Sequence, residues 1–258
     1  MHVKPKKKLG QHFLRNSDIA ARVVDSLTGI GNYQHVLEIG PGTGVLSQFL
    51  IQRKHWQWWG VEVDHESVIY LKKQFPDYNS FVLHQDFLSM DVASFSQSQS
   101  VAVIGNFPYN ISSQILFKVL ENRHLITEVV GMFQKEVAQR IVAPPGKKIN
   151  GILSVLCQAF YNVELLFMVD EYEFFPPPKV KSAVIRLTRN ETVKLDCNEK
   201  DFFNVVKTAY NQRRKTLRNA LRSLSVDWSD TTVEHLSGQR AEQLHVNEFV
   251  AITKTLSS

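Results

Sequence analysis

Val36-Leu37-Glu38-Ile39-Gly40-Pro41-Gly42-Thr43-Gly44 is the part of the sequence that indicates the fold most clearly. Its first part has the character of a short buried strand, and its glycines predict a tight loop with unusual backbone dihedrals. The apolar residues that follow return at helical spacing, at Val45, Leu46, Phe49 and Leu50. A strand, a glycine loop and a helix in this order form a nucleotide site, because the helix start offers unpaired N–H groups to a ligand. The spacing G-x-G-x-G differs from the G-x-G-x-x-G of pyrophosphate-binding loops, which favours a ligand without phosphates.

Acidic residues end the next two strand-like segments. Trp58–Asp64 carries Glu62 about 20 residues after the loop, the separation at which a carboxylate holds ribose hydroxyls. Phe81–Gln85 is followed by Asp86, which is placed to accept a hydrogen bond from an adenine amine. Each acid taken singly is more readily explained as a helix cap or a solvated loop residue. Their order at successive strand ends favours a nucleoside-binding site.

The tetrapeptide Asn106-Phe107-Pro108-Tyr109 follows a further apolar run, Val101–Gly105. Its chemistry suits an exocyclic adenine amine, which is a poor nucleophile because its lone pair is delocalised into the ring. The Asn106 amide oxygen and the Pro108 carbonyl can accept the two amine hydrogens, and stacking of a base on Tyr109 is worth ~1–3 kcal/mol. An Asn-x-Pro turn after a buried strand is the alternative for the tetrapeptide alone. Behind the glycine loop and the two acids, it predicts an enzyme that methylates adenine.

The composition is that of an ordinary folded protein. The chain has 258 residues, of which 43% are apolar and 21% charged, enough for one large domain or a large and a small one. Cys157 and Cys197 form no C-x-x-C pair, so we expect free thiols and no metal site. The basic N-terminus has no signal-peptide core and no stretch is long enough to span a membrane, so we expect a cytoplasmic protein without membrane contact.

Strand-like and helix-like segments alternate as far as Leu166, which predicts a mostly parallel sheet with crossover helices. The three prolines of Phe174–Val180 predict a stiff extended loop, and Val184–Leu187 predicts a closing strand. We therefore predict an α/β domain over residues 1–188 and a small α-helical domain over residues 189–258. Besides the helix after the glycine loop, helices are expected at three places in the first domain: Ile19–Leu27 with Ser17 or Asp18 as its cap, Ser112–Leu120, and Phe133–Val142.

Basic residues are clustered along a chain whose net charge is +5 and whose isoelectric point is about 9.1. For any single cluster the simpler reading is a solvated face. A helix over 210–224 would place an apolar stripe (Leu217, Ala220, Leu221, Leu224) beside a stripe of arginines (Arg214, Arg218, Arg222). Such a helix would pack through leucine and offer arginine to phosphates. The expected RNA-binding residues are Arg213, Arg214, Lys215, Arg218, Arg222, Lys147 and Lys148.

Six motifs spread over nearly the whole chain closely resemble the KsgA/RsmA family. They are Lys8–Leu14, Glu38–Gly44, Gly105–Ser112, Gln134–Val137, Phe174–Val180 and Gln212–Arg218. The resemblance implies a Rossmann-like methyltransferase that uses S-adenosylmethionine (SAM) to dimethylate two adjacent adenosines in a hairpin loop near the 3′ end of 16S rRNA. It also implies, as partner, the immature 30S subunit, and we expect a monomer.

The resemblance assigns roles to individual residues. The residues implied for SAM are His12, Leu14, Gly40, Gly42, Glu62, Asp86 and Asn106. Asn106, Pro108 and Tyr109 would hold the target base, and Phe174 would stack on its other face. His12 stands where the family commonly has Asn, so protonation of its imidazole makes SAM affinity dependent on pH.

Three alternatives stay open at this stage. The nearest is the related large-subunit rRNA adenine methyltransferase that confers antibiotic resistance, although the triple-proline loop and Gln212–Arg218 look more like KsgA/RsmA. A nicotinamide oxidoreductase would use the glycine loop, but it would leave Asn106–Tyr109 unexplained. A non-catalytic ribosome-assembly factor would use the basic surfaces alone or in addition to catalysis.

Overall fold

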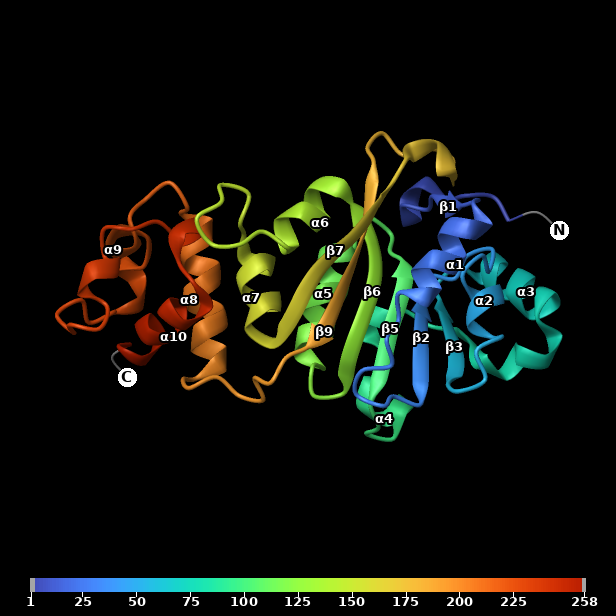
Figure 1. Cartoon of the computed structure of the whole chain (residues 1–258), viewed down its shortest axis with the longest axis horizontal. Helices are drawn as coiled ribbons and strands as arrows, with labels where there is room; N and C mark the ends of the chain where they lie inside the picture. Colours follow the sequence, from blue (N-terminus) through green and yellow to red (C-terminus); the bar gives the residue numbers. More distant parts are fainter. Residues whose placement is uncertain (1–2, 257–258) are drawn as a thin grey trace. The chain divides into compact units, whose positions relative to one another are not determined.

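The computed structural model describes residues 3–256, and the chain divides into two compact units (Figure 1). Unit 1 runs up to Ala138 and resumes over Val163–Arg189. Unit 2 comprises Gln139–Asn162 and the chain from Asn190 onward. The predicted division after residue 188 falls one residue before the end of unit 1, but the segment 139–162 lies with the second unit. The reason is that helix α7 (Ile152–Phe160) packs against α8 (Glu199–Asn211) and α10 (Val246–Lys254).

A single large sheet organises unit 1. Its strands β2, β3, β4, β5 and β6 are parallel to their neighbours, and β9 joins antiparallel to β6, so the predicted mostly parallel α/β fold is confirmed. Parallel order brings the carboxyl ends of β2 to β5 to one edge, where open α/β sheets bind their ligands. Among the described residues the strand order is β4 (Val82–His84), β3 (Gln57–Glu62), β2 (His35–Ile39), β5 (Val101–Asn106), β6 (Ile126–Gln134), β9 (Ser182–Arg189) and β7 (Tyr161–Val169).

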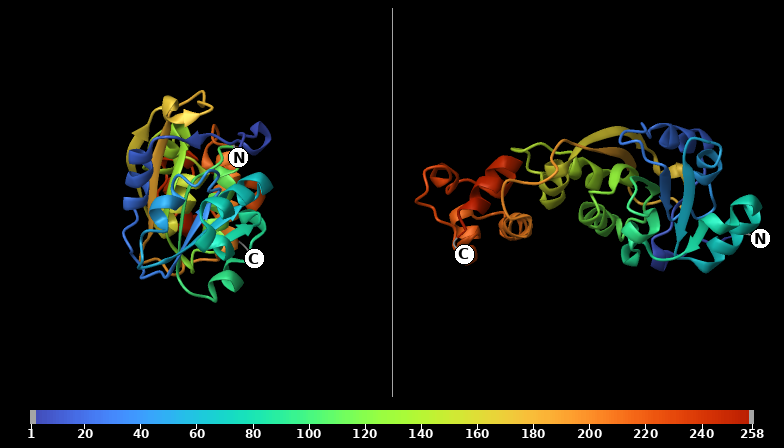
Figure 2. Two further views of the ribbon diagram at one scale, coloured as in Figure 1. Left: turned by 90° about the vertical axis from the view of Figure 1, so that its right-hand side faces the viewer. Right: turned by 90° about the horizontal axis from the view of Figure 1, so that it is seen from below.

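Helices cover both faces of this sheet, because every second residue of a buried parallel strand points to the opposite side. On one face, Val36 and Ala102 share a core with α1, α2 and α3. On the other, α5 buries an apolar stripe that includes Ile115 and Leu116. Figure 2 shows the blue N-terminal helices on one side of the sheet and the green helix α5 on the other. The helix bounds are α1 Ser17–Asp25, α2 Ser47–Leu50, α3 His65–Gln74, α4 Val92–Ser96 and α5 Ser112–Glu121.

Two predicted helix limits in the first domain were wrong. The side chain of Asn16, and not Ser17 or Asp18, caps α1 by accepting hydrogen bonds from the N–H groups of Asp18 and Ile19. Phe133 belongs to β6, which continues to Gln134 because β9 pairs with it along its whole second half. Helix α6 therefore begins only at Lys135 and ends at Ile141.

A two-stranded antiparallel sheet holds the N-terminal segment in unit 1. Strand β1 (Phe13–Leu14) pairs with β8 (Phe174–Phe175), which begins the proline loop. This pairing brings residues 6–12 to the carboxyl edge of the large sheet. Within residues 3–256, no helix combines the length and the apolar character needed to cross a membrane.

Unit 2 is helical, but the predicted helix over 210–224 was wrong. Helix α8 ends at Asn211, and a new short helix, α9 (Leu217–Ala220), begins after an extended Thr216. The backbone N–H groups of Leu217 and Arg218 donate to the carbonyls of Gln239 and Ser237. Since these N–H groups are engaged by another segment, they cannot continue α8.

Candidate active site

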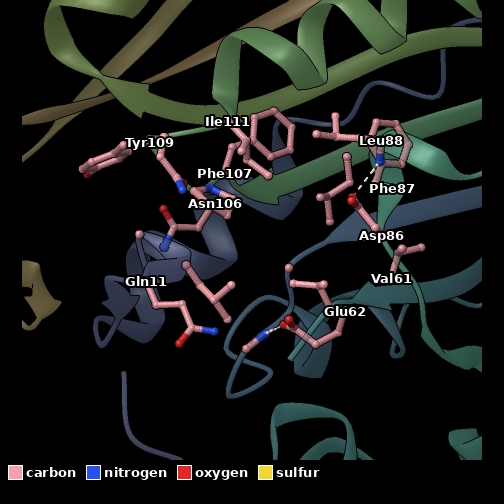
Figure 3. Close-up of a pocket in the computed structure, with 18 of the residues that line it drawn as sticks. Gln11, Val61, Glu62, Asp86, Phe87, Leu88, Asn106, Phe107, Tyr109 and Ile111 are labelled. Atoms are coloured by element: carbon pink, nitrogen blue, oxygen red, sulfur yellow. Dashed lines mark hydrogen bonds between the residues drawn. The ribbon is translucent and has the colours of Figure 1, made fainter. Parts of the chain in front are cut away.

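A cavity of about 210 Å3 opens at the carboxyl edge of β2, β3, β4 and β5 in unit 1 (Figure 3). Most of the residues predicted to bind SAM or the target base line this cavity. The predicted residues that line it are His12, Gly40, Gly42, Glu62, Asp86, Asn106, Pro108 and Tyr109. Leu14 and Phe174 do not line it. The remaining wall is largely apolar.

The glycine loop follows β2 and bends closely around the cavity. Gly42 has φ +57°, and a Cβ atom at this position would lie 2.8 Å from Cε1 of Phe13. Only glycine therefore fits, both in conformation and in space. The backbone N–H of Gly42 donates to Oε2 of Glu62 at 3.0 Å, which ties the loop to the end of β3.

Two carboxylates face the cavity from neighbouring strands. Glu62 is 3% exposed, and its Oε1 accepts from the N–H of Asp64 at 2.8 Å. Burial raises the pKa of Glu62, and the N–H donors oppose this rise only in part. Asp86 is exposed and caps the turn Phe87–Ser89 by accepting from Leu88 N–H at 2.9 Å. Asp86 is thus a cap, and because only one of its carboxylate oxygens is engaged within residues 3–256, its contact with an adenine amine stays a prediction.

The amide of Asn106 has a fixed orientation at the end of β5. Its Nδ2 donates to the backbone carbonyl of His12 at 2.8 Å. Nδ2 therefore points to the N-terminal segment, and Oδ1 accepts no hydrogen bond from the part of the chain that the structure describes. Asn106 consequently presents an acceptor, and not a donor, to a ligand in the cavity.

Phe107 anchors the loop that carries Asn106. Its ring is 1% exposed and packs edge-to-face on Phe133 at 5.2 Å between centroids. Gly105 and Gly131 are paired on β5 and β6, and a Cβ atom on Gly131 would lie 2.4 Å from the Phe107 ring. The two glycines thus make the slot that holds Phe107. Gly131 was missed from sequence because the slot exists only where the two strands pair.

Pro108 and Tyr109 form the next part of the wall. The Pro108 carbonyl accepts from Ile111 N–H at 3.1 Å and keeps a second lone pair for another donor. The Tyr109 hydroxyl lies 2.5 Å from Oγ of the buried Ser182. Burial raises the pKa of Tyr109, so the residue is a neutral phenol near neutral pH.

His12 links three segments around the cavity. Its Nδ1 lies 2.7 Å from the carbonyl oxygen of Pro176, and since a carbonyl only accepts, Nδ1 carries a hydrogen. Its ring stacks on Tyr109 with centroids 5.4 Å apart and an interplanar angle of 27°. His12 therefore covers one face of the Tyr109 ring.

Lys6 fixes the N-terminal segment beside the cavity. It was not among the site residues predicted from the sequence. Its Nζ lies 2.5 Å from Oδ1 of the buried Asp64 and 3.2 Å from Oε1 of Glu66. The backbone N–H of Lys6 donates to the side chain of Gln11 at 2.8 Å. These contacts hold Leu9–His12 against the end of β3, where those residues line the cavity.

Leu14 and Phe174 require a correction. They are paired across β1 and β8, and both side chains are 2% exposed in the core of unit 1. Residues of one cross-strand pair share a face of the sheet, and here that face is the inner one. The positions of these two side chains therefore do not support stacking of Phe174 on the target base or a place for Leu14 in the lining of the SAM site. The neighbouring Phe175 is 54% exposed.

Apolar cavity walls were also missed. Val63 is 51% exposed although it is a large apolar residue, and it lines the cavity together with Leu88 and Ile111. A sequence signal was present, since Val63 stands between two acids just after a strand. A flat adenine ring suits such a wall, and the carboxylates suit ribose hydroxyls and an amine. The residues present therefore fit SAM.

The predicted RNA-binding residues all belong to unit 2 and are all exposed. Arg213 has a structural partner, because its guanidinium donates to the carbonyl of Lys148 at 2.5 Å. The remaining side chains of this group make no ion pair within residues 3–256.

Comparisons with known proteins agree with this geometry. Residues 2–258 match the family model described as ribosomal RNA adenine dimethylase. The chain is 55% identical to ribosomal RNA small subunit methyltransferase A of Cytophaga hutchinsonii, with 99% of this chain and 98% of that protein covered. It is 51% identical to the protein of the same name from Bacteroides thetaiotaomicron, covering 97% and 93%. Among solved structures, a dimethyladenosine transferase from Plasmodium falciparum is 25% identical with a TM-score of 0.77, covering 93% and 96%.

Proposed function

Since this chain belongs to the ribosomal RNA adenine dimethylase family, we propose that it dimethylates two adjacent adenosines near the 3′ end of small-subunit rRNA. It is a SAM-dependent rRNA adenine dimethyltransferase. The observation that carries the proposed chemistry is the orientation of Asn106, a cavity residue whose Nδ2 donates to the His12 carbonyl at 2.8 Å, which leaves Oδ1 as the acceptor for a ligand. Curated relatives at 51–55% identity bear small-subunit names, which supports the small subunit over the large one.

SAM would be held by the glycine loop, by the two carboxylates at the ends of β3 and β4, and by the apolar wall. When bound, SAM supplies a methyl carbon on a sulfonium that a nitrogen lone pair attacks directly, so no covalent enzyme intermediate is needed. Glu62 would accept from the ribose hydroxyls, and Asp86 from the adenine amine of the cofactor. Val63 and Leu88 would lie against the cofactor's ring. The segment with Leu9–His12 closes the cavity from the N-terminal side.

The target adenine would be held by two acceptors. Oδ1 of Asn106 and the Pro108 carbonyl accept the two amine hydrogens and draw the nitrogen lone pair away from the ring. The base stacks on the face of Tyr109 that His12 leaves uncovered. Catalysis by such a site consists of positioning and electrostatics. A general base is not required, because the alkylated amine is a strong acid and loses its proton readily.

The second transfer uses the same groups. After the first methyl group is added, the amine keeps one hydrogen, so one of the two acceptors is sufficient. The amine must rotate to bring its lone pair back toward the methyl donor. The target itself must be unstacked, which is cheap for an adenosine in a single-stranded loop.

We place this activity on a partly assembled small subunit in the cytoplasm, with the enzyme acting as a monomer. The exposed cations of unit 2 would contact phosphates, which position an RNA without reading its sequence.

Labelled SAM incubated with unmethylated small and large subunits tests the proposal. We expect label in small-subunit adenine with the wild-type enzyme and none with Asn106→Ala. Asn122→Ala is the matched control, because Asn122 makes the same amide-to-carbonyl bond, to Lys118 at 2.9 Å, away from the cavity. Label in large-subunit RNA alone would overturn the proposed substrate.

A further inference from the structure

A second cavity, of about 330 Å3, lies within unit 2, far along the chain from the glycine loop. It is formed by α9, by the turn Arg222–Leu224 and by the segment that follows. Two of the residues that line it are Leu221, which is fully buried, and Trp228, which is half-buried. The chain turns sharply here, with Ser225 at φ +45°. The cavity lining thus combines a partly open aromatic ring with a buried apolar side chain.

Two cations border this cavity and are not neutralised. The guanidinium carbon of Arg218 lies 5.9 Å from the centroid of the Trp228 ring. Neither Arg218 nor Arg222 forms an ion pair with any of residues 3–256. The nearby Asp227 turns to its own loop, because Oδ1 accepts from Ser229 N–H at 2.9 Å and from Ser229 Oγ at 2.6 Å.

An arginine without an ion pair beside a partly open indole suits a ligand that carries both a flat ring and a negative charge. A phosphate alone would use the arginines and leave the open part of the Trp228 ring without a contact. An unstacked base uses the indole face, and base stacking on aromatic or guanidinium planes is how proteins hold single-stranded RNA. A partly open indole and two cations that line the same cavity match a nucleobase and its flanking phosphates.

We propose that this cavity binds one unpaired nucleotide of the substrate RNA, other than the adenosine that is methylated. The base stacks on Trp228, and the flanking phosphates contact Arg218 and Arg222. Asn219 lines the same cavity, and because its Nδ2 donates to Thr216 Oγ1 at 3.1 Å, its Oδ1 is the group offered to the edge of the nucleobase. The inference rests on the proposed function only in taking RNA as the ligand, and it concerns residues outside the candidate active site.

The first test uses the indole N–H signals of the full chain, which contains four tryptophans. Trp228→Phe identifies the Trp228 signal. Addition of a short single-stranded oligoribonucleotide should shift that signal and leave the Trp58 signal in place, since Trp58 is buried and donates to Glu38 at 2.9 Å. An abasic strand of equal length should have a much smaller effect. Equal shifts with both strands, or no shift at Trp228, would overturn the proposal.

The second test measures affinity for the same oligoribonucleotide by fluorescence anisotropy. Trp228→Ala should weaken binding about 10-fold, which is ~1.4 kcal/mol and within the range for one stacked base. Trp228→Phe should keep most of the affinity, because a ring remains. Arg222→Ala should lower the slope of log affinity against log salt by about 0.7, the value for one phosphate of a single strand.

Lys200→Ala is the charge-matched control, because Lys200 is exposed on the first turn of α8 and outside the cavity. At low salt, Lys200→Ala should bind the oligoribonucleotide as tightly as the wild type does, unlike Arg222→Ala. Preference of the cavity for an acidic peptide over RNA would refute the proposal. Both tests measure RNA binding and not methylation. Their outcome therefore does not depend on whether the proposed adenine chemistry is right.

Discussion

Asn106→Ala is the perturbation that most sharply separates binding from chemistry in this site. The wild-type Oδ1 is free to accept an amine hydrogen, whereas Nδ2 is spent on the His12 carbonyl at 2.8 Å. Loss of one preorganised hydrogen bond to a reacting group costs about 100- to 1,000-fold in kcat. Loss of the bond to His12 costs ~1 kcal/mol, which raises the dissociation constant of SAM by about 5-fold at most. We therefore expect a large fall in rate with a small fall in cofactor affinity.

The assay is single-turnover methylation of small subunits at saturating SAM, with SAM affinity measured separately by calorimetry. Asn122→Ala should behave as wild type in both measurements, since its amide lies outside the cavity. A methylation rate for Asn106→Ala within about 10-fold of wild type, which is ~1.4 kcal/mol, would refute the assigned role. Equal losses in rate and in SAM affinity would also refute it, because Asn106 would then serve cofactor binding alone.

Three further predictions concern the surroundings of the cavity. Tyr109→Phe should keep most of the methylation rate, because the ring remains and only the hydroxyl contact to Ser182 at 2.5 Å is lost, whereas Tyr109→Ala should lose most of it in the same assay. Burial raises the pKa of Glu38 from 4.5 to about 7, so the free energy of unfolding should fall as the pH rises from about 4.5 to about 7, by ~3 kcal/mol at ~1.36 kcal/mol per pKa unit. In denaturant titrations, Glu38→Gln should make the free energy of unfolding depend less on pH. If the pH dependence stayed the same, Glu38 would not be its source. Gly131→Ala should destabilise the protein by ~1–3 kcal/mol in thermal melts and lower the methylation rate, because its Cβ atom would strike the Phe107 ring; a variant with wild-type stability would show that the slot is not needed.

The parts of the site that were predictable from sequence are those set by local chain order. A glycine loop after β2 and acids after β3 and β4 must meet, because parallel strands bring their carboxyl ends to one edge. Glu62, Asp86 and Asn106 therefore all line the cavity as expected.

The parts that failed depend on partners distant in the chain. The face on which the Phe174 side chain lies is set by its pairing with Leu14, 160 positions earlier in the chain. The periodicity of a sequence does not reveal such a distant pairing. The break between α8 and α9 comes from hydrogen bonds that residues 237 and 239 accept. Gly131 matters only because Gly105 stands beside it on the next strand.

Reverse transcription across the 3′ region of small-subunit RNA, after incubation with the enzyme and SAM, tests directly whether two adjacent adenosines are dimethylated. Dimethylated adenine cannot form its base pair and stops the polymerase. We expect two adjacent stops at adenosines in a hairpin loop, both absent when Asn106→Ala replaces the wild type. Absence of stops with active wild-type enzyme, or stops only in large-subunit RNA, would contradict this expectation.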